Sequence, residues 1–183
     1  MRQEIILSGA GGQGLILAGA ILAEAAGVFE NKEVVQTQSY GIQATGGASQ
    51  STVIISDCAI KFPEVLSPHV LLSLSQEAYE RYSPRLRQGG MLIVDQDLVH
   101  TGNIPPSIRC FRLPFTAAAE KLNRRILANV IALGGLSALT SVVTPESLAN
   151  AIPFRLPESN VPLALEALRV GVRMAEEKRI VQA

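Results

Sequence analysis

The stretch from residue 4 to residue 14 reads Glu-Ile-Ile-Leu-Ser-Gly-Ala-Gly-Gly-Gln-Gly, an apolar strand followed at once by a glycine-rich turn. Gly9, Gly11 and Gly14 fit the G-x-G-x-x-G spacing, and a helix rich in alanine and leucine is expected directly after them. Such a turn needs glycine where φ is positive, or where a ligand or a second backbone approaches closely. The stretch therefore predicts an α/β fold, with either a phosphate group at the helix N-terminus or a tight packing turn.

The rest of the chain alternates between strand-like and helix-like segments. Further strands are expected at residues 33–37, 51–56, 70–74 and 91–94, and helices at residues 15–26, 76–87, 115–122, 126–139, 145–151 and 160–177. Gly27 is expected to end the first helix, and Thr144 to cap the helix that Pro145 begins. A strand–helix–strand crossover implies parallel strands covered by helices. We therefore predict a single domain over residues 1–183: a three-layer α/β/α fold with a Rossmann-like, mostly parallel sheet and a helical C-terminal portion.

Composition narrows the classes of partner and site. Of the 183 residues, 48% are hydrophobic and 17% are charged, and 16 Lys and Arg balance 16 Asp and Glu, which gives no support for nucleic acid or a membrane surface as a partner. No apolar run approaches the roughly 20 residues of a membrane span, and we expect a cytoplasmic protein. Cys58 and Cys110 are too few for a disulfide framework or an iron–sulfur cluster, and both are expected to be small buried hydrophobic residues.

The first glycine turn lacks the partner that a dinucleotide site needs. The second strand should then end in Asp or Glu, which would hold the ribose hydroxyls, but the sequence there is Gln36-Thr37-Gln38. Gln13 is the only functional side chain within the turn, and its amide could bind an anion or another chain. The glycines indicate close approach at a helix N-terminus, and they do not by themselves indicate NAD.

A second glycine loop, residues 39–49, follows the second strand. Carboxyl ends of parallel strands share one edge of a sheet, so both loops are expected on one rim, with Tyr40 near Gln13. Tyr40 could stack on a ring, hydrogen-bond a ligand oxygen, or be a half-buried aromatic at the base of the loop.

Groups for catalysis are sparse. His69 and His100 are isolated, and no catalytic sequence motif occurs. Asp95 and Asp97 close a strand, where they could bind a cation, although a turn and helix-capping role is favoured. The sequence therefore predicts loops that bind and no self-contained catalytic set.

Several stretches resemble a known family when taken together. They are Gly9-Ala-Gly-Gly-Gln-Gly14, Ser39-Tyr-Gly41, Gly46-Gly-Ala-Ser49, Val53-Ile-Ile-Ser56, Leu74-Ser-Gln-Glu-Ala78, Gly89-Gly-Met-Leu-Ile-Val-Asp95 and Asn129-Val-Ile-Ala-Leu-Gly134. In order and spacing the chain resembles the gamma subunit of 2-oxoacid:ferredoxin oxidoreductases. It is most similar to the 2-oxoglutarate type within the pyruvate/ketoisovalerate gamma family.

The resemblance implies an activity that other chains complete. The whole enzyme would decarboxylate a 2-oxoacid oxidatively with coenzyme A, giving acyl-CoA, CO2 and reduced ferredoxin. Alpha, beta and ferredoxin-like delta subunits would carry thiamine diphosphate, Mg²⁺ and iron–sulfur clusters, while this chain alone would bind no cofactor or metal and would supply no catalytic residue.

The resemblance also implies which residues face the active-site region and the coenzyme A path. These are Gly11, Gly12, Gln13, Tyr40, Gly41, Gly46 and Gly47. Relatives commonly have Arg just before the Gly-Gly pair where this chain has Thr45, which cannot pair bidentately with a phosphate or carboxylate. Two alternatives stay open: a stand-alone NAD(P)- or flavin-binding oxidoreductase, and a purely structural assembly subunit.

Overall fold

A mixed six-stranded sheet forms the centre of the computed structural model, which describes residues 1–39 and 47–182. The strands are β1 (Arg2–Ala10), β2 (Glu33–Ser39), β3 (Ala48–Ser56), β4 (Val70–Ser73), β5 (Met91–Asp95) and β6 (Arg109–Leu113). Their spatial order is β2-β3-β1-β4-β5-β6, and β1, β4, β5 and β6 are parallel neighbours. The prediction of a mostly parallel sheet is confirmed.

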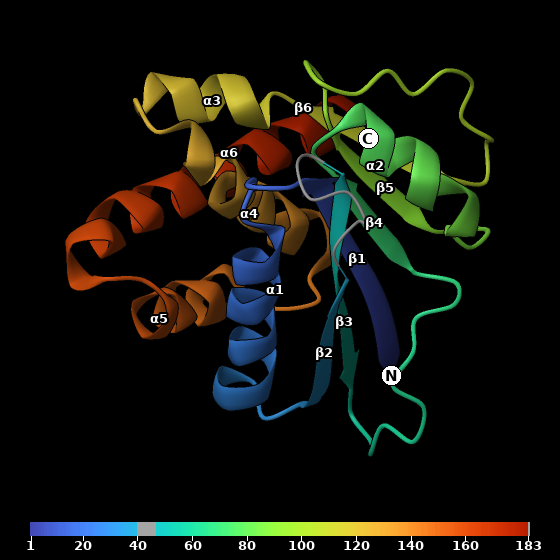
Figure 1. Ribbon diagram of the computed structural model, residues 1–183, viewed down its shortest axis with the longest axis horizontal. Coiled ribbons are helices and arrows are strands. Elements are labelled where there is room, and N and C mark those ends of the chain that lie inside the picture. The colour runs from blue at the N-terminus through green and yellow to red at the C-terminus, as the bar shows by residue number, and fades with distance from the viewer. Residues whose placement is uncertain (40–46, 183) are drawn as a thin grey trace.

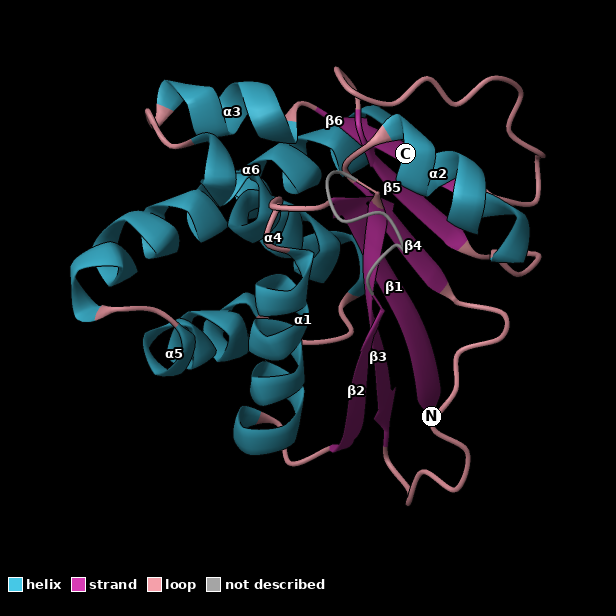
Figure 2. Cartoon of the chain, in the orientation of Figure 1, coloured by secondary structure: helices cyan, strands magenta, loops and turns pink. Residues whose placement is uncertain are grey.

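Helices cover both faces of the sheet. They are α1 (Leu15–Glu24), α2 (Gln76–Tyr82), α3 (Phe115–Lys121), α4 (Ala128–Thr140), α5 (Pro145–Arg155) and α6 (Val161–Gln182). Figure 1 shows α1, α4, α5 and α6 on one side and α2 on the other, and Figure 2 shows the same layers by type of element. Side chains alternate along β1, so Ile5 and Leu7 join the larger core beneath α1, whereas Ile6 joins the smaller core beneath α2. The sheet and the helices on its two faces therefore form three layers.

β3 lies next to β1, where a simple strand–helix–strand crossover would place β2. β1 and β2 run in the same direction, as expected, but they are not neighbours, because β3 lies between them and pairs antiparallel with both. Only a short stretch of chain connects β2 to β3, and a short connection returns a strand antiparallel. β2 is therefore an edge strand.

Two other details differ from expectation. Gly27 does not end the first helix: the chain continues as a π-helical turn over Ala25–Phe29, and Asn31 (φ 54°) takes the left-handed conformation instead. Asn tolerates that conformation, so it can do what a capping glycine does. β6 was not predicted, because its short Arg-Cys-Phe-Arg-Leu sequence buries only Phe111 and Leu113 fully.

The helical C-terminal portion forms largely as predicted. The Thr144 side chain accepts a hydrogen bond from the Ser147 backbone N–H at 3.1 Å, and Pro145 begins α5. α4 and α6 pack closely through glycines: a Cβ on Gly171 would lie 1.8 Å from the Ile131 carbonyl oxygen. No helix in the described part of the chain is both long and apolar enough to cross a membrane.

Asp57, at the end of the sheet far from the glycine turn, supplies a pH-dependent contribution to stability. Its hydrogen bond from Lys32 lowers the pKa of the carboxyl from 3.8 to about 2. The stabilisation is therefore present above about pH 4 and is lost as the pH falls toward about 2. Asp57→Asn should lower the urea midpoint slightly at about pH 6 and leave it unchanged at about pH 2, since exposed ion pairs contribute little. An equal effect at both pH values would contradict this assignment.

Candidate functional site

The glycine turn joins the end of β1 to the start of α1, and its glycines have different roles. Gly12 and Gly14 have φ of 88° and 73°, values that favour glycine, and Gly14 is the residue that precedes α1. Gly9 instead leaves space for a side chain, because a Cβ there would lie 2.3 Å from the Gln13 side-chain oxygen and Gln13 would have to shift. The turn is thus shaped both by backbone conformation and by the packing of its own glutamine.

Gln13 holds the turn against the neighbouring strand. Its Oε1 accepts a hydrogen bond from the Ala10 N–H at 2.7 Å, and its Nε2 donates to the Leu74 carbonyl at 2.9 Å. The oxygen and one N–H of this amide, which the sequence offered for binding an anion or another chain, are therefore used within the chain. Leu74 directly follows β4, so the two hydrogen bonds of Gln13 connect the carboxyl end of β1 to that of β4.

Asn129, at the start of α4, fixes the turn from the other side. Its Nδ2 donates to the Gly14 carbonyl at 3.0 Å, and its Oδ1 accepts from the Val130 N–H at 2.7 Å. Only 2% of Asn129 is exposed, so both partners are needed to satisfy a buried amide. Asn129 was singled out in sequence only as part of a longer motif, and no local signal indicated its contact with Gly14.

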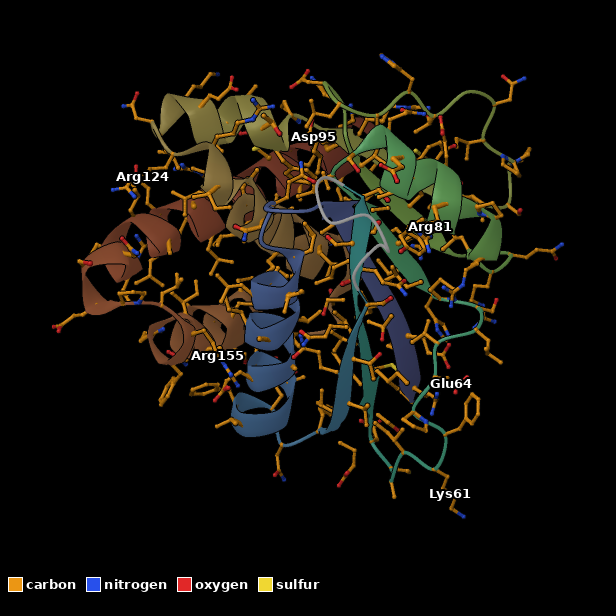
Figure 3. All side chains as sticks on the ribbon, in the orientation of Figure 1. Lys61, Glu64, Arg81, Asp95, Arg124 and Arg155 are labelled. Atoms are coloured by element: carbon orange, nitrogen blue, oxygen red, sulfur yellow. The ribbon has the colours of Figure 1, made fainter. Side chains whose placement is uncertain are left out.

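Asp95 takes the capping role that the sequence favoured over cation binding. Its fully buried carboxylate accepts from the Asp97 N–H at 3.0 Å and from the Thr116 N–H at 2.7 Å. Thr116 lies in the first turn of α3, where backbone N–H groups lack helical partners. Figure 3 places Asp95 at the upper edge of the sheet, near the start of α3.

The second glycine loop meets the first at the same rim. The Gly11 N–H donates to the Gly47 carbonyl at 3.3 Å, which places these two predicted site residues in contact. Ser49, on β3, donates to the Gly9 carbonyl at 3.3 Å and links the loops further. Four other residues named in the sequence analysis lie outside the described residues: Tyr40, Gly41, Thr45 and Gly46.

A pocket of about 330 Å³ opens beside the glycine turn. It is lined by Gly11, Gly12, Gln13, Leu74, Thr116, Arg125, Ile126 and Ala128. Among the described residues that line the pocket, Arg125 is the only charged one, and its one ion pair within the described part of the chain, with Glu120, is long at 3.9 Å and exposed. Sequence reasoning did not select Arg125 or Thr116, since nothing near them in the chain marks them as partners of the glycine turn.

The composition of this lining determines what the pocket can do. Backbone groups, a hydroxyl and a guanidinium suit recognition of a polar or anionic group. None of the described lining residues is His, Cys, Asp or Glu, so the pocket brings no acid–base pair to a reacting atom. The described lining thus offers groups suited to binding.

β2 is also unlike the second strand of a dinucleotide-binding fold. The Gln36 amide donates to the Ile16 carbonyl at 3.1 Å and to the Ser51 hydroxyl at 3.0 Å, beneath α1. In a dinucleotide fold the strand carrying the ribose acid lies next to the first strand, whereas here β3 occupies that place. Topology and side chains together disfavour the nicotinamide alternative.

A protein-family model described as pyruvate ferredoxin/flavodoxin oxidoreductase matches residues 4–174. The chain belongs to this family. In this oxidoreductase family, the 2-oxoglutarate synthase subunit KorC of Methanocaldococcus jannaschii is 47% identical over 179 residues, covering 97% of this chain and 96% of the relative.

Solved structures agree with the pyruvate ferredoxin/flavodoxin oxidoreductase assignment. The crystal structure of a keto/oxoacid ferredoxin oxidoreductase gamma subunit from Geobacter sulfurreducens has a TM-score of 0.86 and 44% identity, over 97% of this chain and 98% of that one. A 2-oxoglutarate:ferredoxin oxidoreductase from Magnetococcus marinus shares the fold, with a TM-score of 0.84 and 22% identity, over 96% of this chain and 31% of that one. The relatives that match end to end are therefore subunits.

Members of an oxidoreductase family need redox groups, and the residues of this chain do not fit an iron–sulfur cluster. The chain has two cysteines, fewer than the four that such a cluster requires. Cys58 is exposed and Cys110 is half-buried, which corrects the expectation that both are buried; burial raises the pKa of the Cys110 thiol. Within residues 1–39 and 47–182, no three His, Cys, Asp or Glu side chains are grouped to hold a metal ion.

Proposed function

We propose that this chain is the gamma subunit of a thiamine diphosphate-dependent 2-oxoglutarate:ferredoxin oxidoreductase. The whole enzyme would convert 2-oxoglutarate and coenzyme A to succinyl-CoA and CO2 while reducing ferredoxin. The full-length similarity to KorC subunits of 2-oxoglutarate synthases supports this substrate. Thiamine diphosphate, Mg²⁺ and iron–sulfur clusters would be held by alpha, beta and delta subunits.

The role we propose for this chain is to complete a binding rim. One observation carries it: the pocket beside the glycine turn gathers backbone groups of Gly11 and Gly12 with the Arg125 guanidinium, and has no acid–base pair. Coenzyme A carries phosphates, and a guanidinium can pair with a phosphate bidentately. We propose that Arg125 and the glycine turn contact coenzyme A, with Gln13 acting chiefly by holding the turn in place.

Steady-state kinetics of the assembled complex test this role. Arg125→Gln should raise the KM for coenzyme A by about tenfold, the loss expected for one charge-assisted hydrogen bond, with kcat and the KM for 2-oxoglutarate little changed. Arg124→Gln is the matched control, because Arg124 is also an exposed arginine but does not line the pocket. Figure 3 shows Arg124 on the outer side of the connection between α3 and α4, away from the sheet.

Other outcomes would favour the alternatives. Unchanged kinetics in Arg125→Gln would support a purely structural assembly subunit. Turnover by the purified chain alone, or tight calorimetric binding of NAD(H), NADP(H) or FAD, would support a stand-alone oxidoreductase and overturn the proposal. We expect the purified chain to be inactive, to lack visible iron–sulfur absorbance and to co-purify with larger subunits when they are co-expressed.

A further inference from the structure

A second pocket lies at the opposite edge of the sheet from the glycine turn. Its volume is about 460 Å³, and it is lined by residues at the starts of β4, β5 and β6. Its polar lining includes Gln3, His69, Arg87, Gln88, Thr140 and Arg109. None of the described residues that line it is Asp or Glu, so the pocket has cationic and neutral polar groups without an acidic partner.

Two N–H groups are directed at the ring of His69, whose neutral form has one lone pair to accept them. The backbone N–H of Glu4 lies 3.1 Å from Nδ1, and in the tautomer that accepts it Nδ1 carries the lone pair. Burial, and then the charge of Arg87, lower the pKa of His69, which favours the neutral ring. A neutral imidazole with a bare Nδ1 carries its hydrogen on Nε2.

In this tautomer, the facing nitrogens of His69 and Arg87 both carry a hydrogen, so both are hydrogen-bond donors. Arg87 Nη1 lies 2.5 Å from His69 Nε2. A guanidinium has no acceptor, and Nε2–H is a donor, so neither group can satisfy the other. Both N–H groups therefore need an acceptor that the described residues do not supply.

The acidic residues near this pocket form no ion pair with Arg87 or Arg109 within the described part of the chain. Among the ion pairs formed within residues 1–39 and 47–182, none involves Arg87 or Arg109. Glu4, which faces His69 from β1, is paired with Arg2 at 2.9 Å, and Glu4 and Glu64 line an adjoining pocket that shares His69 and Arg87 with this one. The pocket that Arg87 and Arg109 line thus has a positive character, which an anion would neutralise.

We propose that this pocket binds a small oxyanion, a phosphate or carboxylate group, that accepts hydrogen bonds from the Arg87 guanidinium and the His69 Nε2–H. Arg109, at the start of β6, adds a second positive charge to the same pocket. An oxygen with several lone pairs can accept from both donors at once, which removes their conflict. The site is separate from the glycine turn and does not depend on the function proposed above.

Calorimetric titration of the full chain with inorganic phosphate and, separately, with acetate tests the proposal at constant ionic strength in sodium chloride. Binding of phosphate alone would assign a phosphoryl ligand, and binding of acetate would assign a carboxylate. Arg87→Gln should weaken the binding by about tenfold or more, and Arg109→Gln should weaken it less. Arg173→Gln, an exposed arginine on α6, is the matched control and should bind as the unaltered chain does.

His69→Asn provides a second, independent variant. The Asn oxygen can replace Nδ1 as the acceptor for the Glu4 N–H, while the Nε2–H donor is lost, so the fold should be retained and anion affinity reduced. In the unaltered chain, sulfate should raise the pKa of His69 as followed by NMR, with His100 as the internal control.

Three results would overturn the proposal. The first is binding no stronger than that of chloride, and the second is unchanged affinity in both Arg87→Gln and His69→Asn. The third is binding to the free chain that disappears in the assembled complex, since that would mean that a partner covers the pocket.

Discussion

Gly171→Ala is expected to destabilise the chain by about 3 kcal/mol, an effect at the upper end of those caused by overpacking a well-packed interior. A Cβ at this position would lie 1.8 Å from the Ile131 carbonyl oxygen and 3.0 Å from the Gly135 nitrogen. Both are backbone atoms of α4, so no side-chain rotation can relieve the clash. The helices themselves would have to separate.

The same contact occurs from the other helix. A Cβ on Gly134 would lie 2.3 Å from the Leu168 carbonyl oxygen on α6. α4 is buried along most of its length, so separating it from α6 would also disturb the larger core. The loss should appear as a lower urea midpoint for the full chain, without a change in the steepness of the transition.

Gly27→Ala is the matched control for this prediction. The nearest atom to a Cβ there is Val34 Cγ2 at 3.6 Å, an ordinary contact, and Gly27 lies in a helical turn. Alanine should therefore leave stability unchanged or raise it by about 0.5–1 kcal/mol, through the lower entropy of the unfolded chain. Equal losses in Gly27→Ala and Gly171→Ala would show that close helix packing is not the cause.

Asp95→Ala is expected to cost about 2–4 kcal/mol, because one buried and one partly buried backbone N–H group lose their acceptor. These are the N–H groups of Asp97 and Thr116, both within 3.0 Å of the carboxylate oxygens. Since Asp95 is fully buried, water cannot easily replace the carboxylate. The start of α3 should then loosen locally, beside the pocket that Thr116 lines.

Urea unfolding gives the total loss, and amide hydrogen exchange locates it. Exchange at Thr116 should accelerate in Asp95→Ala more than exchange in the centre of α6, which Asp95 does not contact. Asp97→Ala is the matched control, because its exposed side chain accepts no hydrogen bond from Thr116. A similar loss of stability in both variants would contradict the capping role of Asp95.

The sequence predicted those features that depend on neighbouring residues. A short continuous apolar run located β1, and the Thr144-Pro145 pair located the start of α5. The glycine spacing located the turn, whose positive φ values at Gly12 and Gly14 explain two of its glycines. These signals are local because strand pleat, helix caps and turns are formed by residues close together in the chain.

Features that depend on distant contacts were not predictable in the same way. No local pattern indicates that β3 inserts between β1 and β2, since strand order is set by how the whole sheet is assembled. Gln13 was singled out from the sequence as a binding side chain, but its hydrogen bond to Leu74 joins residues 61 positions apart. Arg125 reaches the pocket only because α3 and α4 fold back over the ends of the strands.

The bond between Asn129 and Gly14 has a consequence for the order of folding. These residues are 115 positions apart, so the turn near the start of the chain gains one of its two side-chain supports only after most of the chain has been synthesised. β1 and Gln13 can be in place earlier, but Leu74 is also distant, and closing such long loops is slow. On the ribosome, we therefore expect the glycine turn to be among the last parts of the molecule to become rigid, after the chain has folded through α4.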